Sequence, residues 1–113
     1  MRYFETKFLE EVDKFISGFD RKTVKKIFYN IDVAEQTNDP KLFKKLQNEI
    51  REFRTKYGRL QIRILAFWDK TDNKETLVLA THGFIKKVDK IPVKEIDRAV
   101  RLREKYFKNK QKL

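Results

Sequence analysis

Three β-rich segments follow one another in the middle of the chain and constrain its fold more than any other feature. They cover residues 50–54, 60–68 and 76–87. Gly58 lies in the first connection, and the polar run 69–75 forms the second. Short polar connections of this kind join antiparallel neighbours, so the segments predict a β-meander.

The middle segment has one wholly apolar face. Because successive side chains of a strand point to opposite faces, residues of one parity lie together. The apolar parity should therefore face helices, and it comprises Leu60, Ile62, Ile64, Ala66 and Trp68. Arg63 lies on the other parity with Leu65 and Phe67, where a charge loses hydration unless a partner compensates it.

Helical periodicity precedes the meander. Apolar residues at helical spacing over 8–19 and 24–34 predict two amphipathic helices, which form a hairpin with one apolar face to bury. Asp20 is placed to cap the second helix. Residues 3–6 predict a short opening strand, and residues 42–46 a short helical turn before the meander.

Helical spacing returns after the meander. Pro92 suits the first turn of a last helix. The residues after it carry a partial apolar stripe up to Phe107. We expect one domain over residues 1–108, followed by a frayed basic tail over residues 109–113.

The composition excludes several classes of function. The 113 residues include no cysteine and one histidine, which rules out thiolate zinc sites, a cysteine nucleophile and multi-histidine metal centres. No apolar run is long enough to cross a membrane, and the start of the chain lacks a signal-peptide pattern, so we expect a soluble cytoplasmic protein without a membrane partner. Only three glycines occur, and they build neither a Walker loop nor a dinucleotide fingerprint.

The charge points to an anionic partner. Lys and Arg number 28 against 17 acidic residues, a formal net charge of +11. Such an excess on a small domain favours nucleic acid, the ribosome or an acidic protein as partner. The alternative is a lysine-rich solvated surface.

Two arginines on neighbouring predicted strands are the first candidate site residues. Arg54 and Arg63 could converge as a fork for a phosphate group. The alternative is that each forms a structural ion pair, for example with Glu52 or Glu49. Spacing alone leaves both interpretations open.

The third β-rich segment contributes further candidates. Lys86 and Lys87 follow it directly, and could steady a phosphate or leaving group, or form an exposed basic turn. His82 is the only histidine and the only side chain whose ordinary pKa suits proton transfer near neutrality. A lone histidine in an apolar strand is more often a packed core residue.

Aromatic residues could stack on bases. Phe67 and Trp68 fit core filling better. Tyr57 lies in the predicted turn before the middle segment and is the better candidate for an exposed position. Tyr106 is a further aromatic of this kind.

Several motifs together resemble the RelE/ParE-type toxins of bacterial toxin–antitoxin systems, in particular the HigB-like, phage-derived branch. The resemblance covers about residues 3–107. It rests on Lys44-Lys45-Leu46, Ile50-Arg-Glu-Phe-Arg54, Arg63-Ile-Leu, and above all Thr81-His-Gly-Phe-Ile-Lys-Lys87 followed by Ile91-Pro92 and Glu95-Ile96-Asp97-Arg98-Ala99.

The resemblance implies an α+β fold, with the N-terminal helical hairpin and the C-terminal helix packed on a small twisted antiparallel sheet. It implies a toxin that cleaves mRNA on the ribosome through attack of the RNA's own 2′-hydroxyl on the scissile phosphate, without metal or cofactor. A cognate antitoxin protein would neutralise it. Relatives that inhibit DNA gyrase without cutting RNA are the alternative, and a basic RNA-binding module is a third.

The resemblance also assigns roles to individual residues. Arg54 and Arg63 would hold and stabilise the scissile phosphate, and Lys86, with Lys87 as the alternative, would assist the phosphate or the departing 5′-oxygen. His82 matches the family's histidine position, whose role, chemical or structural, stays open. Further RNA contacts are expected at Lys45, Tyr57, Arg59 and Lys87.

Overall fold

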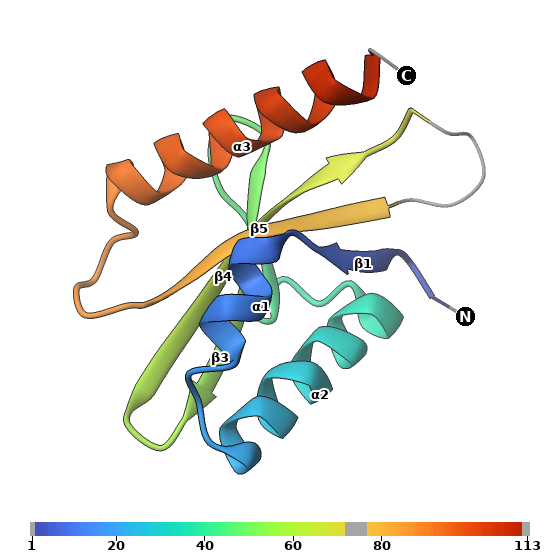
Figure 1. The fold of residues 1–113 in the computed structure, drawn as a ribbon. Coiled ribbons are helices and arrows are strands. Elements are labelled where there is room, and N and C mark those ends of the chain that lie inside the picture. Colours follow the sequence, from blue (N-terminus) through green and yellow to red (C-terminus); the bar gives the residue numbers. More distant parts are fainter. Residues whose placement is uncertain (1, 72–76, 112–113) are drawn as a thin grey trace.

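A five-stranded sheet with helices on both faces forms the protein (Figure 1). The computed structural model describes residues 2–71 and 77–111. Within them the elements are, in chain order, β1 (Glu5–Phe8), α1 (Glu10–Ile16), α2 (Arg21–Thr37), β2 (Phe43–Lys45), β3 (Ile50–Tyr57), β4 (Leu60–Asp69), β5 (Leu77–Ile85) and α3 (Val93–Gln111). The strand order is β1-β5-β4-β3-β2.

The predicted meander is confirmed as β3, β4 and β5, which pair antiparallel in sequence order. Gly58 adopts a φ of 59° in the two-residue connection between β3 and β4, a conformation that glycine reaches without strain. This tight turn sets Tyr57 opposite Leu60, and counting outward from it sets Arg54 directly opposite Arg63.

Two short edge strands extend the meander. β1 pairs parallel with β5 and begins two residues later than the predicted strand at residues 3–6. β2 pairs antiparallel with β3, so the helical turn predicted for residues 42–46 is wrong. Three or four apolar positions carry too little periodicity to define a helix, and pairing with β3 decides the conformation.

The sheet separates two apolar cores. Ile62, Ile64 and Ala66 of β4 pack with residues of α1 and α2, which confirms the predicted helix-facing parity. Leu65 and Phe67 pack on the other face with residues of α3. The α3 face, which also carries Arg63, is the one that positions the candidate site.

The helical predictions are largely correct in type and less so in extent. α1 is shorter than the predicted helix at both ends, since Phe8 belongs to β1 and the helix ends at Ile16. Asp20 caps α2, and its side chain accepts a hydrogen bond from the Thr23 backbone N–H at 2.9 Å.

The last helix is longer than predicted. α3 continues to Gln111, so residues 109–111, which were assigned to a frayed tail, are helical. The remaining tail residues, 112–113, lie outside the described residues. The α+β class and the RelE-like arrangement of hairpin, sheet and last helix are confirmed. In the described ranges no helix is long and apolar enough to span a membrane.

Candidate functional site

A cleft of about 270 Å³ opens on the α3 face of the sheet, close to the start of α3. Lys44 comes from β2, and Glu52 and Arg54 come from β3. Lys86 and Asp89 come from the segment between β5 and α3. The fold therefore gathers three cations and two carboxylates from three separate stretches of the chain.

Glu52 connects the two predicted arginines. Its carboxylate lies 3.5 Å from the Arg54 Nε through Oε1 and 3.8 Å from the Arg63 Nε through Oε2. Arg54 and Arg63 are direct cross-strand partners, an arrangement of like charges that is unfavourable on its own. The ion-pair alternative is therefore present in the structure, with Glu52 rather than Glu49 as the partner.

Arg63 lies behind the cleft and is not among the side chains that line it. Only 3% of the residue is exposed. Its guanidinium donates hydrogen bonds to the Ile62 carbonyl and the Gln61 side-chain oxygen, both at 3.1 Å. Burial lowers the pKa of Arg63 from its ordinary value, and Glu52 opposes this shift. Arg63 is therefore placed to position the Glu52 carboxylate from the interior of the protein.

Arg54 and Lys86, by contrast, line the same cleft. About a third of the Arg54 side chain is exposed, which leaves its guanidinium accessible to a ligand. The Lys86 backbone N–H donates a hydrogen bond to the Gln61 carbonyl at 2.7 Å, and this bond fixes the chain just beyond β5. Of the two arginines of the predicted fork, only Arg54 lines the cleft, and Lys86 is the cation that lines it with Arg54.

Three charged residues that line the cleft were not among the sequence candidates for the site. Lys44 pairs with Glu52 across β2 and β3, and this register brings it to the cleft. Asp89 and Glu52 add the carboxylates. Glu52 carried a signal in the sequence, because it shares the parity of Arg54 on the same strand.

His82 is buried behind α3 and does not line the cleft. Its Nδ1 lies 3.0 Å from the Thr81 Oγ, and its Nε2 lies 3.4 Å from the Glu95 carboxylate. Burial and the charge of Arg98 lower the pKa of His82, and Glu95 partly offsets this. A neutral histidine in this place connects β5 to α3, which agrees with the packing interpretation.

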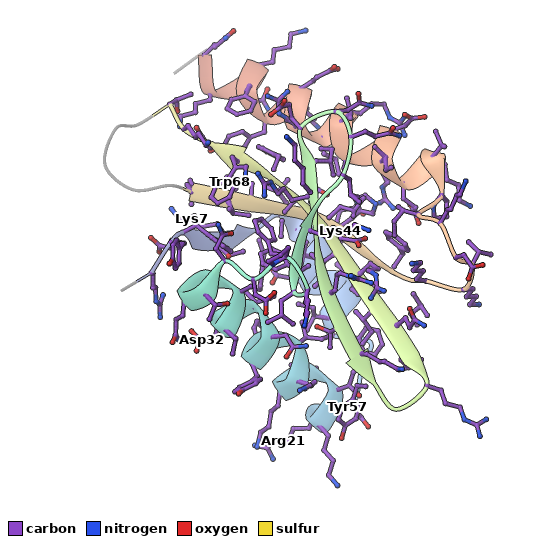
Figure 2. All side chains as sticks on the ribbon, turned by 180° about the vertical axis from the view of Figure 1, so that it is seen from behind. Lys7, Arg21, Asp32, Lys44, Tyr57 and Trp68 are labelled. Carbon is purple, nitrogen blue, oxygen red and sulfur yellow. The ribbon has the colours of Figure 1, made fainter. Side chains whose placement is uncertain are left out.

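The four residues expected to contact RNA are scattered over the surface. Lys87 is exposed beside the cleft but does not line it. Tyr57 lies at the end of the β3–β4 hairpin, far from Lys44 (Figure 2), and Arg59 lies in the turn of that hairpin. Lys45 lines a different cavity, near Trp68.

The cleft can recognise a phosphate and move a proton. Arg54 offers a planar group of N–H donors, and the two lysine ammonium groups add point charges. Carboxylates next to these cations can accept a proton from a hydroxyl group. Within the described part of the chain, no group of three His, Asp or Glu side chains is close enough to hold a metal ion.

The comparison with protein families covers this whole site. The model of the phage-derived Gp49-like proteins (DUF891) matches residues 14–104, which include every side chain that lines the cleft. Among curated proteins, no sequence matches the chain. The chain therefore belongs to the Gp49-like family of phage-derived proteins, which is related to the RelE/HigB-type toxins.

Proposed function

We propose that this protein is a HigB-like toxin that cleaves mRNA on the ribosome and that a cognate antitoxin neutralises. The observation that supports this proposal most directly is the cleft, where Arg54, Lys86 and Lys44 surround Glu52. Such a site suits a phosphodiester, because its cations stabilise the negative charge that accumulates on the phosphate oxygens in the transition state of phosphoryl transfer. The net charge of +11 suits ribosomal RNA as the wider partner.

In the proposed reaction the 2′-oxygen of the RNA attacks the adjacent phosphorus atom. A P–O2′ bond forms and the P–O5′ bond breaks, which leaves a 2′,3′-cyclic phosphate and a free 5′-hydroxyl. Arg54 donates hydrogen bonds to the phosphate oxygens, whose charge rises in the transition state. The Lys86 ammonium group stabilises the departing 5′-oxygen and supplies its proton.

The proton of the 2′-hydroxyl needs an acceptor in the cleft. His82 is buried outside it, whereas Glu52 and Asp89 line it. The variants Glu52→Gln and Asp89→Asn, assayed at a temperature at which both are shown to be folded by circular dichroism, separate the two, since the variant that lacks the acceptor should lose the ascending limb of the pH–rate profile. A profile that is unchanged in both variants would rule out a carboxylate as the acceptor.

The central experiment adds the protein to a translating extract and maps mRNA 5′ ends by primer extension. We expect cuts at codon-phased positions that require ribosomes. Arg54→Gln should slow cleavage by about 10²–10³-fold, and Lys86→Gln by about 10²-fold. Lys87→Gln is the matched control, because it removes the same charge from the neighbouring residue outside the cleft.

Other outcomes would contradict the proposal. Equal losses in Lys86→Gln and Lys87→Gln would show that general charge, and not the cleft, drives the effect. Intact mRNA in the extract, together with arrested growth of cells that express the protein, would exclude the nuclease. Inhibition of DNA supercoiling in the same cells would then favour the gyrase alternative.

A further inference from the structure

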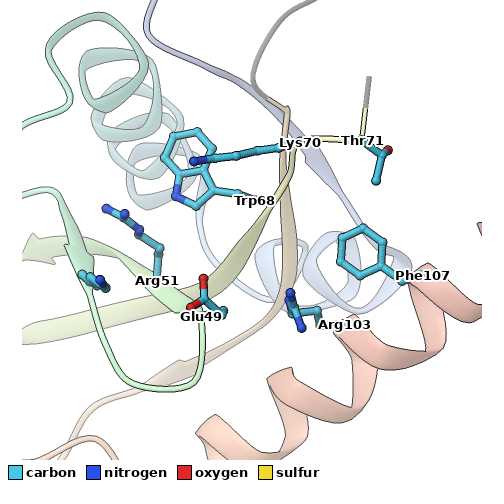
Figure 3. Close-up of a pocket in the computed structure, with 8 residues that line it drawn as sticks. Glu49, Arg51, Trp68, Lys70, Thr71, Arg103 and Phe107 are labelled. Atoms are coloured by element: carbon cyan, nitrogen blue, oxygen red, sulfur yellow. The ribbon is translucent and has the colours of Figure 1, made fainter. Parts of the chain in front are cut away.

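A second cavity, of about 510 Å³, lies where β4 runs on past the start of β3. The pairing of these strands ends at Ile50 opposite Phe67, so Trp68 extends beyond the partner strand. Glu49 from the loop before β3 and Arg103 from α3 complete the walls (Figure 3). The cavity thus forms where β4 extends beyond its pairing with β3.

Cations dominate this cavity. Lys45, Arg51, Lys70 and Arg103 line it, against the single carboxylate of Glu49. The surplus of positive charge favours an anionic ligand.

Aromatic rings hold three of these cations in place. The Arg51 Cζ and the Lys70 Nζ each lie 5.4 Å from the centre of a Trp68 ring. The Arg103 Cζ lies 5.1 Å from the Phe107 ring. Cation–π contacts of this length restrict flexible side chains, which reduces the entropy lost when a ligand binds. They also occupy the Trp68 ring, which leaves it less free to stack on a base.

Two side chains that line this cavity carry a buried N–H group with no acceptor among the described residues. The Trp68 Nε1 and the Arg103 Nε are shielded from solvent, and among the described residues neither donates a hydrogen bond. A buried N–H group without a partner is costly. Both groups are shielded, so they reach a ligand in the cavity only when the side chains shift towards it, and the cost of leaving them unpaired favours that shift for a ligand rich in acceptors. Unpaired donors and surplus positive charge together fit a phosphate group.

We propose that this cavity binds backbone phosphates of the single-stranded RNA that occupies the cleft, and this inference rests on the proposed function. The two sites flank the β2–β3 hairpin. The neighbouring residues Lys44 and Lys45 each line one of them, because successive side chains of a strand point to opposite faces. A strand of RNA crossing this hairpin meets cations on both sides.

The single tryptophan of the chain makes the cavity directly observable. Trp68 emission is followed while the protein is titrated with a short, uniformly 2′-O-methylated RNA, which lacks the attacking hydroxyl. We expect a saturable change in emission that weakens with salt. In parallel, the anisotropy of a labelled copy of the same RNA reports total binding.

The variant Lys70→Gln/Arg103→Gln removes two cations from the cavity. It should bind the RNA about tenfold or more weakly and lower the salt slope by about one to two. The variant Lys22→Gln/Lys25→Gln is the matched control, because it removes equal charge from exposed positions on α2. It should bind RNA almost as the wild type does.

Three results would overturn the inference. The first is RNA binding by anisotropy with unchanged Trp68 emission, and the second is equal binding by the two double variants. The third is a full emission change with inorganic phosphate and none with RNA, which would assign the cavity to free phosphate. Arg54→Gln separates this inference from the nuclease proposal, because it should slow cleavage by about 10²–10³-fold while the Trp68 response persists.

Discussion

Replacing Glu52 by Gln should destabilise the fold strongly, because it leaves the Arg63 guanidinium buried without its counter-charge. At 3.8 Å and an effective dielectric constant of about 20, the attraction between the two groups is about 4 kcal/mol. Removing one member of a buried pair costs about 3–5 kcal/mol, which agrees with this figure. Since small domains have only about 5–15 kcal/mol of stability, we expect a fall in Tm of roughly 15 °C or more.

A double-mutant cycle tests the assignment of this cost to the pair. Urea unfolding is measured for the wild type, Glu52→Gln, Arg63→Met and the double variant. The double variant should recover at least about 2 kcal/mol relative to the sum of the single losses, because no unpaired charge remains in the interior. Glu49→Gln makes the same chemical change at an exposed site and should stay within about 0.5 kcal/mol of the wild type.

Additive losses, with coupling below about 0.5 kcal/mol, would refute the view that Arg63 and Glu52 form one unit. So would an unfolding midpoint in Glu52→Gln equal to that of the wild type. In either case Arg63 would need another compensating partner.

Three further predictions concern the packing of the helices. The lowered pKa of His82 means that the unfolded chain binds a proton more readily than the folded protein does. The free energy of unfolding should therefore be highest above about pH 6.5 and fall below it. In urea unfolding, His82→Gln should flatten this pH dependence. Gly83→Ala would place its Cβ 2.2 Å from the Phe15 ring and should cost about 1–3 kcal/mol in thermal unfolding, whereas Gly18→Ala, with its nearest atom at 3.5 Å, should change little. Burial raises the pKa of Asp69, but the hydrogen bonds that its carboxylate accepts from α3 and Thr71 lower the pKa overall. The stabilisation of the fold by the charged carboxylate should therefore be present above about pH 4 and be lost below it. By calorimetry, Asp69→Asn should cost about 1–3 kcal/mol at pH 7, and the loss of stability in acid should be smaller than in the wild type.

The order and antiparallel pairing of the central strands could be predicted from their short connections. The register comes from the structure: β3 continues to Tyr57, beyond the segment predicted to end at residue 54, and the two-residue connection at Gly58 then pairs Tyr57 with Leu60 and Arg54 with Arg63. The same counting places Glu52 on the face of both arginines. Local sequence patterns also gave the helix-facing side of β4 and the Asp20 cap.

The edges of the sheet and the far wall of the cleft depend on contacts that no local pattern encodes. β2 is three residues long, and only its pairing with β3 brings Lys44 opposite Glu52. Asp89 reaches the cleft because the segment after β5 turns back towards the start of α3. Such tertiary contacts override weak local preferences in short segments.

The position of His82 shows why strict alternation was not enough on β5. Ala80 and His82 share a parity and would lie on one face of a regular strand. Instead, Ala66 pairs with Ala80 while the preceding Leu65 pairs with His82, so Thr81 is an extra residue in β5. This bulge turns His82 towards Glu95 of α3 while Ala80 stays in the core of α1 and α2. A glycine inside a strand marks a bulge or the close approach of another group. At Gly83 the close approach is present, against Phe15, and the bulge lies two residues earlier. One inserted residue thus places the only histidine in the contact between sheet and helix and keeps it out of the cleft.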